Sequence, residues 1–376
     1  MKFTVARDVL ADAVNWTART VPNRPSVAIL AGIRITSADA ALTLSSFDYE
    51  VATKSEIPAD VAEDGDILVS GRLLSAIAKA MPNHSIECTL DGSKLDLVCG
   101  SSHFSLATMP VDEYPPLPAS PEPCGAVDAH EFATAVNQVM VATSTDDAIP
   151  LLMAVRMEID DDKITLLATD RYRLAMRELR WQPGCAGLNT AMLVKGKVLR
   201  DVAKTMATGQ SLELAFDQQS YGAGPMIGFH SGTRHTTSTL MDGDYPPVRR
   251  LFPEETSIHA VVNRVELLEA VRRVSLVAPQ KTTLRVRFTG DRLTLEAGQD
   301  DNAQGSEVIA ASINTDSFET AYNPQFLEQG LAVIESEYVR FAYTDPQRPV
   351  VISGQNDQGE ADTSFKYLLM PMRIDI

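Results

Sequence analysis

The chain has 376 residues, of which 44% are hydrophobic, 22% are charged and 6% are aromatic. This length exceeds what one hydrophobic core supports, so two or three domains are expected, and the balanced composition excludes collagen-like, low-complexity and disordered chains. The formal net charge of −17 argues against a surface that is cationic overall, which is the usual means of binding nucleic acid.

The amino-terminal segment MKFTVARDVLADAV carries charges among its apolar positions and lacks the continuous apolar stretch of a signal peptide. No later run approaches the ~20 apolar residues of a membrane-spanning helix, so we expect a cytoplasmic protein that does not enter membranes. The four cysteines, Cys88, Cys99, Cys124 and Cys185, form no CxxC pair, and their spacing favours reduced structural residues over a zinc site.

The first predicted helix recurs at the start of each third of the chain, with apolar residues at positions i, i+3 and i+4. The three copies carry Leu10, Ala13 and Val14; Phe132, Ala135 and Val136; and Leu267, Ala270 and Val271. This spacing places the apolar residues on one helical face, so each helix is expected to pack on a sheet.

A second predicted helix also recurs. VSGRLLSAIAKAM begins at Val69, VKGKVLRDVAKTM begins at Val194, and a weaker match, YNPQFLEQGLAVI, begins at Tyr322. The first two copies share a helical apolar stripe, formed by Leu74, Ile77, Ala78 and Met81 in one and by Leu199, Val202, Ala203 and Met206 in the other.

Each unit closes with an alternating strand that runs into a proline turn. The copies are FSLATMPVDEYPPL from Phe104, HTTSTLMDGDYPPV from His235 and FKYLLMPMRI from Phe365. Segments such as SIECTLDGSKLDLVCG, KITLLATD and LRVRFTGDRLTLEAG indicate strands and hairpins. We therefore predict an α+β protein of three repeated domains, 1–122, 123–253 and 254–376, each with two helices packed on antiparallel sheet.

No catalytic or cofactor motif accompanies this repeat. The sequence contains no HExxH, GxSxG, Walker loop or GxGxxG pattern, and its six histidines are scattered. The acidic run Asp160, Asp161 and Asp162 lies between two apolar strand segments, which favours a hairpin turn over a metal site. We expect neither an enzyme nor a cofactor or metal. A metal-dependent enzyme and a peptide-binding repeat scaffold that never encircles DNA stay open as alternatives.

The three degenerate units, the chain end YLLMPMRI and the ATDRYRL and DYPPVRR segments together resemble the bacterial DNA sliding clamp family, the beta subunit of DNA polymerase III, over the whole chain. The resemblance implies a non-catalytic processivity factor that joins head to tail with a second copy as a ring around duplex DNA. It implies partners that dock through short linear peptides: the polymerase III alpha subunit, the clamp-loader delta subunit, and other polymerases and repair proteins. A ring holds DNA by topology, so a modest cationic lining suffices on an otherwise acidic protein.

Cations recur at matched positions of the second helix. Arg72 and Lys79 correspond to Lys197 and Lys204, and the resemblance assigns DNA contact to these residues together with Arg24, Lys195 and Arg200. In the third unit, Arg264, Arg272 and Arg273 accompany the first helix, while the second helix carries Gln325, Glu328 and Gln329, so the lining is expected to be uneven. Any one of these cations alone is more commonly a solvated helix residue, and the recurrence favours DNA.

The resemblance also implies a peptide pocket built from three separated segments. Its residues are Leu152, Thr169, Arg171, Tyr172, Arg173, Leu174, Pro246, Arg250, Leu251, Leu368, Leu369, Met370, Pro371, Met372 and Arg373. Soft leucine and methionine side chains fit varied peptide anchors, and arginines at the rim bind polar acceptors. Without the resemblance, LLMPM indicates an ordinary strand and DRYR a charged turn. Some family members have glycine and histidine in place of Arg171 and Tyr172.

Phe104 and Leu106 in the first unit, and Leu276 and Val277 in the third, are the positions at which the resemblance implies that two protomers meet. Edge strands with exposed apolar residues require a partner, although single apolar residues on strands more commonly belong to a core. The sequence leaves open whether this is the main replication clamp or a second copy, and the role of Asp375 and Ile376.

Overall fold

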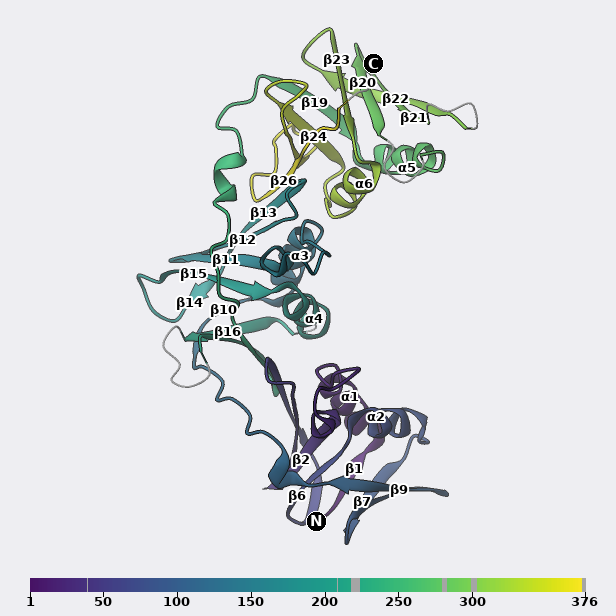
Figure 1. The fold of residues 1–376 in the computed structure, drawn as a ribbon, viewed down its shortest axis with the longest axis vertical. Coiled ribbons are helices and arrows are strands. Elements are labelled where there is room, and N and C mark those ends of the chain that lie inside the picture. Colours follow the sequence, from purple (N-terminus) through teal and green to yellow (C-terminus); the bar gives the residue numbers. More distant parts are fainter. Residues whose placement is uncertain (39, 208, 218–223, 279–282, 299–302, 374–376) are drawn as a thin grey trace. The chain divides into compact units, whose positions relative to one another are not determined.

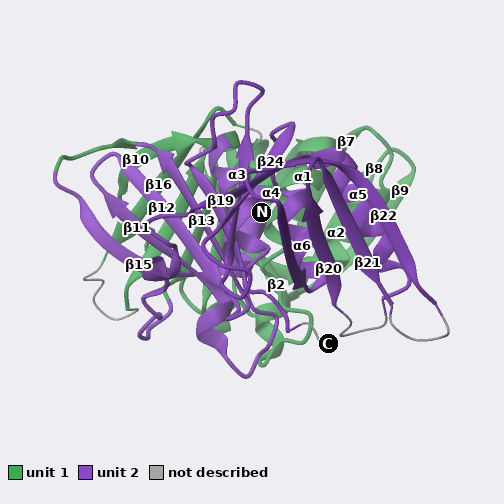
Figure 2. Ribbon diagram, turned by 90° about the horizontal axis from the view of Figure 1, so that it is seen from above, with its two compact units in different colours: residues 1–130, 182–186, 204–240 green, residues 131–181, 187–203, 241–376 purple. Residues whose placement is uncertain are grey.

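The computed structural model describes residues 1–38, 40–207, 209–217, 224–278, 283–298 and 303–373. The chain divides into two compact units (Figure 2). Unit 1 contains residues 1–130, 182–186 and 204–240, and unit 2 contains residues 131–181, 187–203 and 241–376. The central third of the chain contributes to both units. The predicted domain boundaries after residues 122 and 253 stay a prediction.

Unit 1 is built on a 14-stranded antiparallel sheet (Figure 1). In spatial order its strands are β14 (Gln182–Pro183), β10 (Pro123–Asp128), β16 (Ser211–Asp217), β17 (Met226–Ser231), β18 (Arg234–Thr239), β4 (Val51–Pro58), β3 (Ala41–Phe47), β2 (Gly32–Ala38), β6 (Gly65–Ser70), β9 (Ser102–Met109), β8 (Lys94–Cys99), β7 (Ser85–Asp91), β1 (Lys2–Ala6) and β5 (Asp60–Glu63). Two short 3-10 helices, η1 (Ala28–Ala31) and η2 (Val111–Glu113), flank the sheet strands.

Two helices of unit 1, α1 (Arg7–Thr17) and α2 (Gly71–Ala80), pack against each other, and α1 also packs on β3 and β4. The predicted apolar stripes are buried in one core cluster, with Leu10 and Val14 from α1 and Leu74 and Ile77 from α2. The predicted hairpin of β7 and β8 is present as well. The helix stripes and the hairpin are therefore confirmed in this unit.

Unit 2 is built on a 12-stranded antiparallel sheet. In spatial order its strands are β15 (Asn189–Lys195), β11 (Ala154–Asp160), β12 (Lys163–Thr169), β13 (Arg173–Arg180), β26 (Phe365–Leu369), β25 (Val350–Gln355), β24 (Tyr338–Tyr343), β19 (Ile258–Asn263), β22 (Gly305–Ile313), β21 (Arg292–Ala297), β20 (Leu284–Thr289) and β23 (Ser317–Tyr322). The 3-10 helices are η3 (Pro150–Met153) and η4 (Val248–Leu251).

Four further helices are α3 (Ala129–Met140), α4 (Gly196–Met206), α5 (Arg264–Ser275) and α6 (Pro324–Ala332). Asparagines begin α5 and α6: the side chains of Asn263 and Asn323 each accept hydrogen bonds from two amides of the first turn. α5 packs against α6, β21 and β22. The predicted apolar residues of these helices are buried, Phe132, Leu199 and Leu267 among them.

The acidic run closes the hairpin of β11 and β12, as predicted. Asp160 pairs with Lys163 across the hairpin, and Asp161 takes a left-handed φ of 50°. The Asp161 carboxylate accepts a hydrogen bond from the amide of Gly187 at 2.8 Å, so it ties the turn to the segment before β15.

The chain end is inserted between strands of distant sequence. β26 pairs with β13 on one side, with Leu369 opposite Arg173 and Leu368 opposite Leu174, and with β25 on the other side. This insertion joins the middle of the chain to its end within one sheet. None of the described helices is both long and apolar enough to cross a bilayer.

Candidate functional site

An apolar cluster in unit 2 gathers all three predicted pocket segments. Leu152 lies in η3, Leu174 in β13 and Leu368 in β26. All three are buried together with Tyr245, which precedes η4, and Val248, which begins it. Leu151, Met241, Phe252 and Val351 pack partly buried against them. The structure therefore brings together residues that lie more than half the chain apart.

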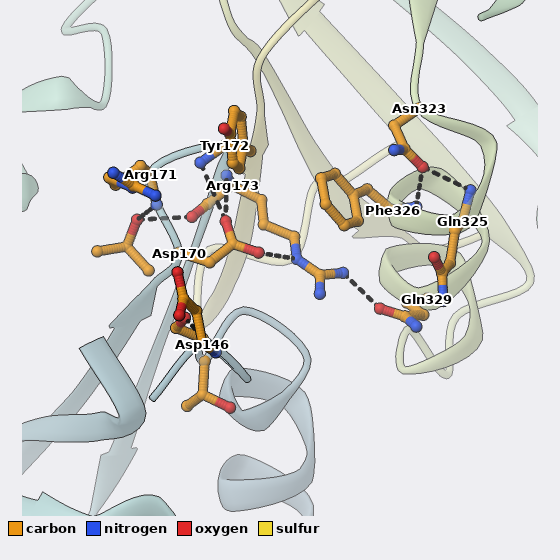
Figure 3. Close-up of polar contacts among 12 residues, drawn as sticks. Asp146, Asp170, Arg171, Tyr172, Arg173, Asn323, Gln325, Phe326 and Gln329 are labelled. Atoms are coloured by element: carbon orange, nitrogen blue, oxygen red, sulfur yellow. Dashed lines mark hydrogen bonds and ion pairs between the residues drawn. The ribbon is translucent and has the colours of Figure 1, made fainter. Parts of the chain in front are cut away.

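The turn between β12 and β13, residues 169–173, lies beside this cluster (Figure 3). The Thr169 hydroxyl donates to the carbonyl oxygen of Arg173 at 2.7 Å and accepts from the amide of Arg171 at 3.2 Å. The Asp170 carboxylate accepts from the amides of Tyr172 and Arg173, each at 3.0 Å. Arg171 has a φ of +80°, a left-handed conformation that is uncommon for a residue with a side chain and that the hydrogen bonds of the turn support.

Arg173 is only 8% exposed, which differs from the expected position at a pocket rim. Its Nε lies 2.9 Å from Asp170 Oδ2, and its Nη1 donates to Gln329 Oε1 at 2.5 Å. The guanidinium carbon lies 4.2 Å from the centroid of the Phe326 ring. Figure 3 shows the two side chains near each other. A buried arginine with these partners connects β13 to α6 and has little capacity left for a ligand.

The chain end continues along the same turn. The amide of Met370 donates to the carbonyl oxygen of Tyr172 at 3.0 Å, and the amide of Met372 donates to Ala321 at 2.8 Å. Leu369 is buried, Pro371 is half-buried and Arg373 is exposed. Asp375 and Ile376 lie outside the described residues.

Three large apolar side chains are exposed next to the buried cluster: Tyr172, Leu251 and Met370. Pro246 and Arg250 are exposed on the same segment as Leu251. Exposed apolar residues that border a buried apolar cluster and are flanked by arginines are typical of a peptide-docking surface.

A cleft of about 720 Å³ borders the 169–173 turn. It is lined by residues 170–173, by Asp146 of the loop after α3, by Arg200 of α4, and by Gln325, Phe326 and Gln329 of α6. The sequence predicted a DNA contact for Arg200 and no role for Phe326. The α6 start, an asparagine cap followed by Pro324, is the local sequence signal that a helix begins here and presents these side chains.

Five of the seven predicted DNA contacts lie on helices. Arg72 and Lys79 of α2, and Lys197, Arg200 and Lys204 of α4, are all exposed, and Lys195 is half-buried just before α4. Arg24 is exposed in the loop before η1. Arg72 also donates to the side chain of Asn23 at 2.5 Å, so it is anchored beside that loop.

Two of the three arginines of α5, in the third predicted repeat at residues 254–376, are paired with carboxylates. Arg272 lies 2.8 Å from Glu328, and Arg273 lies 2.6 Å from Glu307. The side-chain hydrogen bond to Glu307 raises the pKa of Arg273 and lowers that of Glu307. Arg264 donates to the carbonyl oxygen of Ser336 at 3.0 Å. The uneven cationic lining stays a prediction.

The predicted protomer contacts differ in exposure. Leu276 is 86% exposed after α5 and Phe104 is 38% exposed on β9, whereas Leu106 is 2% exposed and belongs to the unit 1 core. Val277 is half-buried. Leu106 is therefore a core residue in the single chain, and any contribution from it to an interface would come through the backbone of its strand.

Models of the DNA polymerase III beta subunit match the chain in three consecutive segments: the N-terminal domain at residues 1–118, the central domain at residues 126–247 and the C-terminal domain at residues 249–373. The beta sliding clamp of Streptomyces coelicolor is 44% identical over 375 residues, which cover 100% of each chain. That of Micrococcus luteus is 49% identical over 313 residues, 83% of this chain and 100% of the relative.

Among solved structures, the DNA polymerase III subunit beta of Pseudomonas aeruginosa is similar over 100% of both chains, with a TM-score of 0.90 and 25% sequence identity. The chain therefore belongs to the DNA polymerase III beta subunit family. This confirms the resemblance drawn from the sequence, including its α+β architecture of three family domains.

Proposed function

We propose that the protein is a DNA polymerase processivity factor, a sliding clamp that encircles duplex DNA and catalyses no reaction itself. The observation that carries this proposal is the match of three family domains along the whole chain, with relatives named beta sliding clamp at 44% and 49% identity. Its place of action would be the bacterial cytoplasm, on the nucleoid.

The ring would form from two copies joined head to tail, each contributing domains 1–122, 123–253 and 254–376. Strand edges support this arrangement. β9 pairs with β8 at residues 102–107 and with β6 only at Thr108 and Met109. β22 pairs with β21 at residues 305–310 and with β19 only at residues 311–313. Joining two such edges would pair backbone groups and cover Phe104 and Leu276.

The exposed cations of α2 and α4 would face the duplex. In a chain with a net charge of −17, a few phosphate contacts give weak, sequence-independent attraction, which permits sliding. Partner proteins would dock short peptides on the surface formed by Tyr172, Leu251 and Met370. Such partners include the polymerase III alpha subunit, the clamp-loader delta subunit, other polymerases and repair proteins.

Retention on DNA tests the topological part of this proposal. The protein, loaded on nicked circular DNA by its cognate clamp loader, is expected to stay bound through gel filtration and to be released when the circle is cut. The uncut circle at the same salt is the control. Equal retention before and after cutting would reject a ring held by topology.

Matched double substitutions test the DNA face. Lys197→Ala with Lys204→Ala is expected to lower the slope of log affinity against log salt by about 2, since each phosphate contact contributes about 0.9. Arg272→Ala with Arg273→Ala, which removes as many cations, should lower it by less than about 1 because their charges are matched by Glu328 and Glu307. Fluorescence anisotropy with a labelled duplex measures both. Equal slopes for the two variants would contradict the assignment.

A further inference from the structure

The turn beside the docking surface has a second copy in unit 1. In the turn between β3 and β4, the Asp48 carboxylate accepts from the amides of Glu50 at 3.0 Å and Val51 at 2.7 Å, as Asp170 does in unit 2. The residue after each aspartate is left-handed, with a φ of +72° at Tyr49 and +80° at Arg171. The two turns therefore share one backbone design.

Buried tyrosines support both turns in the same way. The hydroxyl oxygen of Tyr114 accepts from the amide of Phe47, the last residue of β3, at 2.7 Å. The hydroxyl oxygen of Tyr245 accepts from the amide of Thr169, the last residue of β12, at 3.2 Å. Each tyrosine precedes a double proline, so the repeat seen in the sequence reappears as a structural device.

The neighbouring strand is also repeated. In unit 1, β18 pairs with β4, and the amide of Thr239 donates to the carbonyl oxygen of Glu50 at 2.9 Å. In unit 2, β26 pairs with β13, and the amide of Met370 makes the corresponding bond to Tyr172 at 3.0 Å. Thr239 thus occupies in unit 1 the position that Met370 of the docking surface occupies in unit 2.

An apolar cluster completes the copy in unit 1. Ile29 and Leu30 of η1, Leu68 and Tyr114 are buried together, as Leu152, Leu193 and Tyr245 are in unit 2. Both units therefore contain the framework of the docking surface: a 3-10 helix, a left-handed turn, a supporting tyrosine and an added strand.

The residue before each aspartate differs in size between the two frameworks. Phe47 packs against the unit 1 cluster, and its ring meets that of Tyr49 edge-on with the centroids 5.7 Å apart. Thr169, at the corresponding position, is small, and its hydroxyl is occupied by the two backbone bonds within its turn. A phenyl ring thus packs on the unit 1 cluster, whereas the corresponding position in unit 2 supplies no ring to its cluster. The exposed residues also differ, because Tyr49 and Glu50 stand where unit 2 has Arg171 and Tyr172.

We propose that segment 169–172 is the specificity determinant that makes the unit 2 framework accept a partner peptide, and that the Phe47 ring closes the corresponding framework in unit 1. This rests on the proposed function, since it concerns the same partner peptides. The ligand is an extended peptide with apolar anchors. The protein therefore holds one peptide per chain although it contains the framework twice.

Substitution of Thr169 tests the proposal in unit 2. The probe is the tightest binder among overlapping labelled peptides that span the cognate polymerase III alpha subunit. Thr169→Phe is expected to lower the affinity of the full-length protein at least about tenfold, or about 1.4 kcal/mol. Thr169→Ser keeps the hydroxyl, and Thr169→Val keeps the size, so both should stay within about threefold of the original affinity. A Thr169→Phe protein that bound normally, or a Thr169→Val protein that lost as much, would overturn the proposal.

A graft in unit 1 tests it without touching Thr169. Phe47→Thr, Tyr49→Arg and Glu50→Tyr together make segment 47–50 identical in sequence to segment 169–172, because Asp48 already matches Asp170. Calorimetry is expected to show two peptides per chain in place of one, and a photoreactive peptide should acquire a new crosslink near Thr239. A stoichiometry that stayed at one would overturn the proposal. Absence of peptide binding to the unsubstituted protein would instead reject the docking part of the proposed function.

Discussion

The turns at Asp48 and Asp170 have the same backbone hydrogen bonds but are anchored differently. In unit 1, Val51 follows the turn, and it can form no polar contact through its side chain. In unit 2, Arg173 stands at that position and joins Asp170, Gln329 and Phe326. The backbone of a repeated turn can therefore be kept while a single side chain, here Arg173, connects one copy to a distant segment of the chain.

This difference has an energetic consequence. Asp48 accepts hydrogen bonds from the backbone amides of Glu50 and Val51. Asp170 accepts from the corresponding amides and also pairs with the Arg173 guanidinium, which is almost fully removed from water. A buried ion pair contributes little net stability against apolar replacement of both partners, but removal of one partner leaves the other charge buried and unpaired. The unit 2 turn should therefore be the more sensitive to single substitutions.

The largest expected effect comes from Arg173→Met. It leaves Asp170 without its cation and removes the contact with the Phe326 ring, so the free energy of unfolding should fall by about 3–5 kcal/mol. Val51→Ala, the matched change in unit 1, should cost only about 1 kcal/mol because it removes part of a half-buried apolar side chain. Urea denaturation followed by circular dichroism measures both, and equal losses would break the comparison.

An intermediate effect is expected from Tyr114→Phe and Tyr245→Phe. Each removes the acceptor of a strand-end amide, which should cost about 1–3 kcal/mol, more for Tyr114 because its hydrogen bond is the shorter, 2.7 Å against 3.2 Å. Denaturation at neutral pH measures this cost. Equal stability of either variant and the unsubstituted protein would show that the amide finds another acceptor.

The same tyrosines predict that the protein loses stability at alkaline pH. Burial raises the pKa of Tyr114 and of Tyr245 to about 12, above the value near 10 of an unfolded tyrosine. As the pH rises, each tyrosine loses its proton in the unfolded state before it does so in the folded state. The stability that the two tyrosines contribute is therefore fully present below about pH 10 and is lost as the pH rises toward 12. The phenylalanine variants should show a shallower loss of stability over that range, and an unchanged slope would contradict the assignment.

The smallest effect is expected from Tyr49→Gly and Arg171→Gly. Glycine relieves the left-handed backbone at both turns but adds freedom to the unfolded chain, so the net change in either unit should stay below about 1 kcal/mol. Gly92→Ala in the β7–β8 hairpin is the control. Its φ is +59° and an added Cβ meets nothing within 4 Å, so only backbone strain, about 1 kcal/mol, should appear. Thermal unfolding measures all three, and a large loss at either turn would mean that its side chain is essential to folding.

Local patterns predicted the secondary structure well. The helical spacing of Leu10, Ala13 and Val14, and of its copies, correctly indicated buried faces, and the Asp-Gly and Gly-Asp pairs correctly marked hairpins. These features depend on neighbours a few residues away, and such neighbours are visible in a sequence.

The site was predicted only in part. Leu152, Leu174 and Leu368 do converge, but Arg173 is buried and not at the rim, because its partners Gln329 and Phe326 come from a helix far along the chain. Phe104 and Leu106 are two residues apart on β9 and are therefore expected on the same face of the sheet, yet only Leu106 is buried in the core. Strand alternation identifies a face of the sheet but not how far the core extends beneath it.

The sequence by itself determined the threefold repetition, the helices with their apolar faces and the family, because each is written in short-range patterns or in identity to relatives. Only the tertiary structure decided which cations are neutralised, as Arg272 and Arg273 are, and which turn received an arginine anchor. Charge pairing and burial depend on which distant segments meet, and it is the packing of the whole chain that brings those segments together.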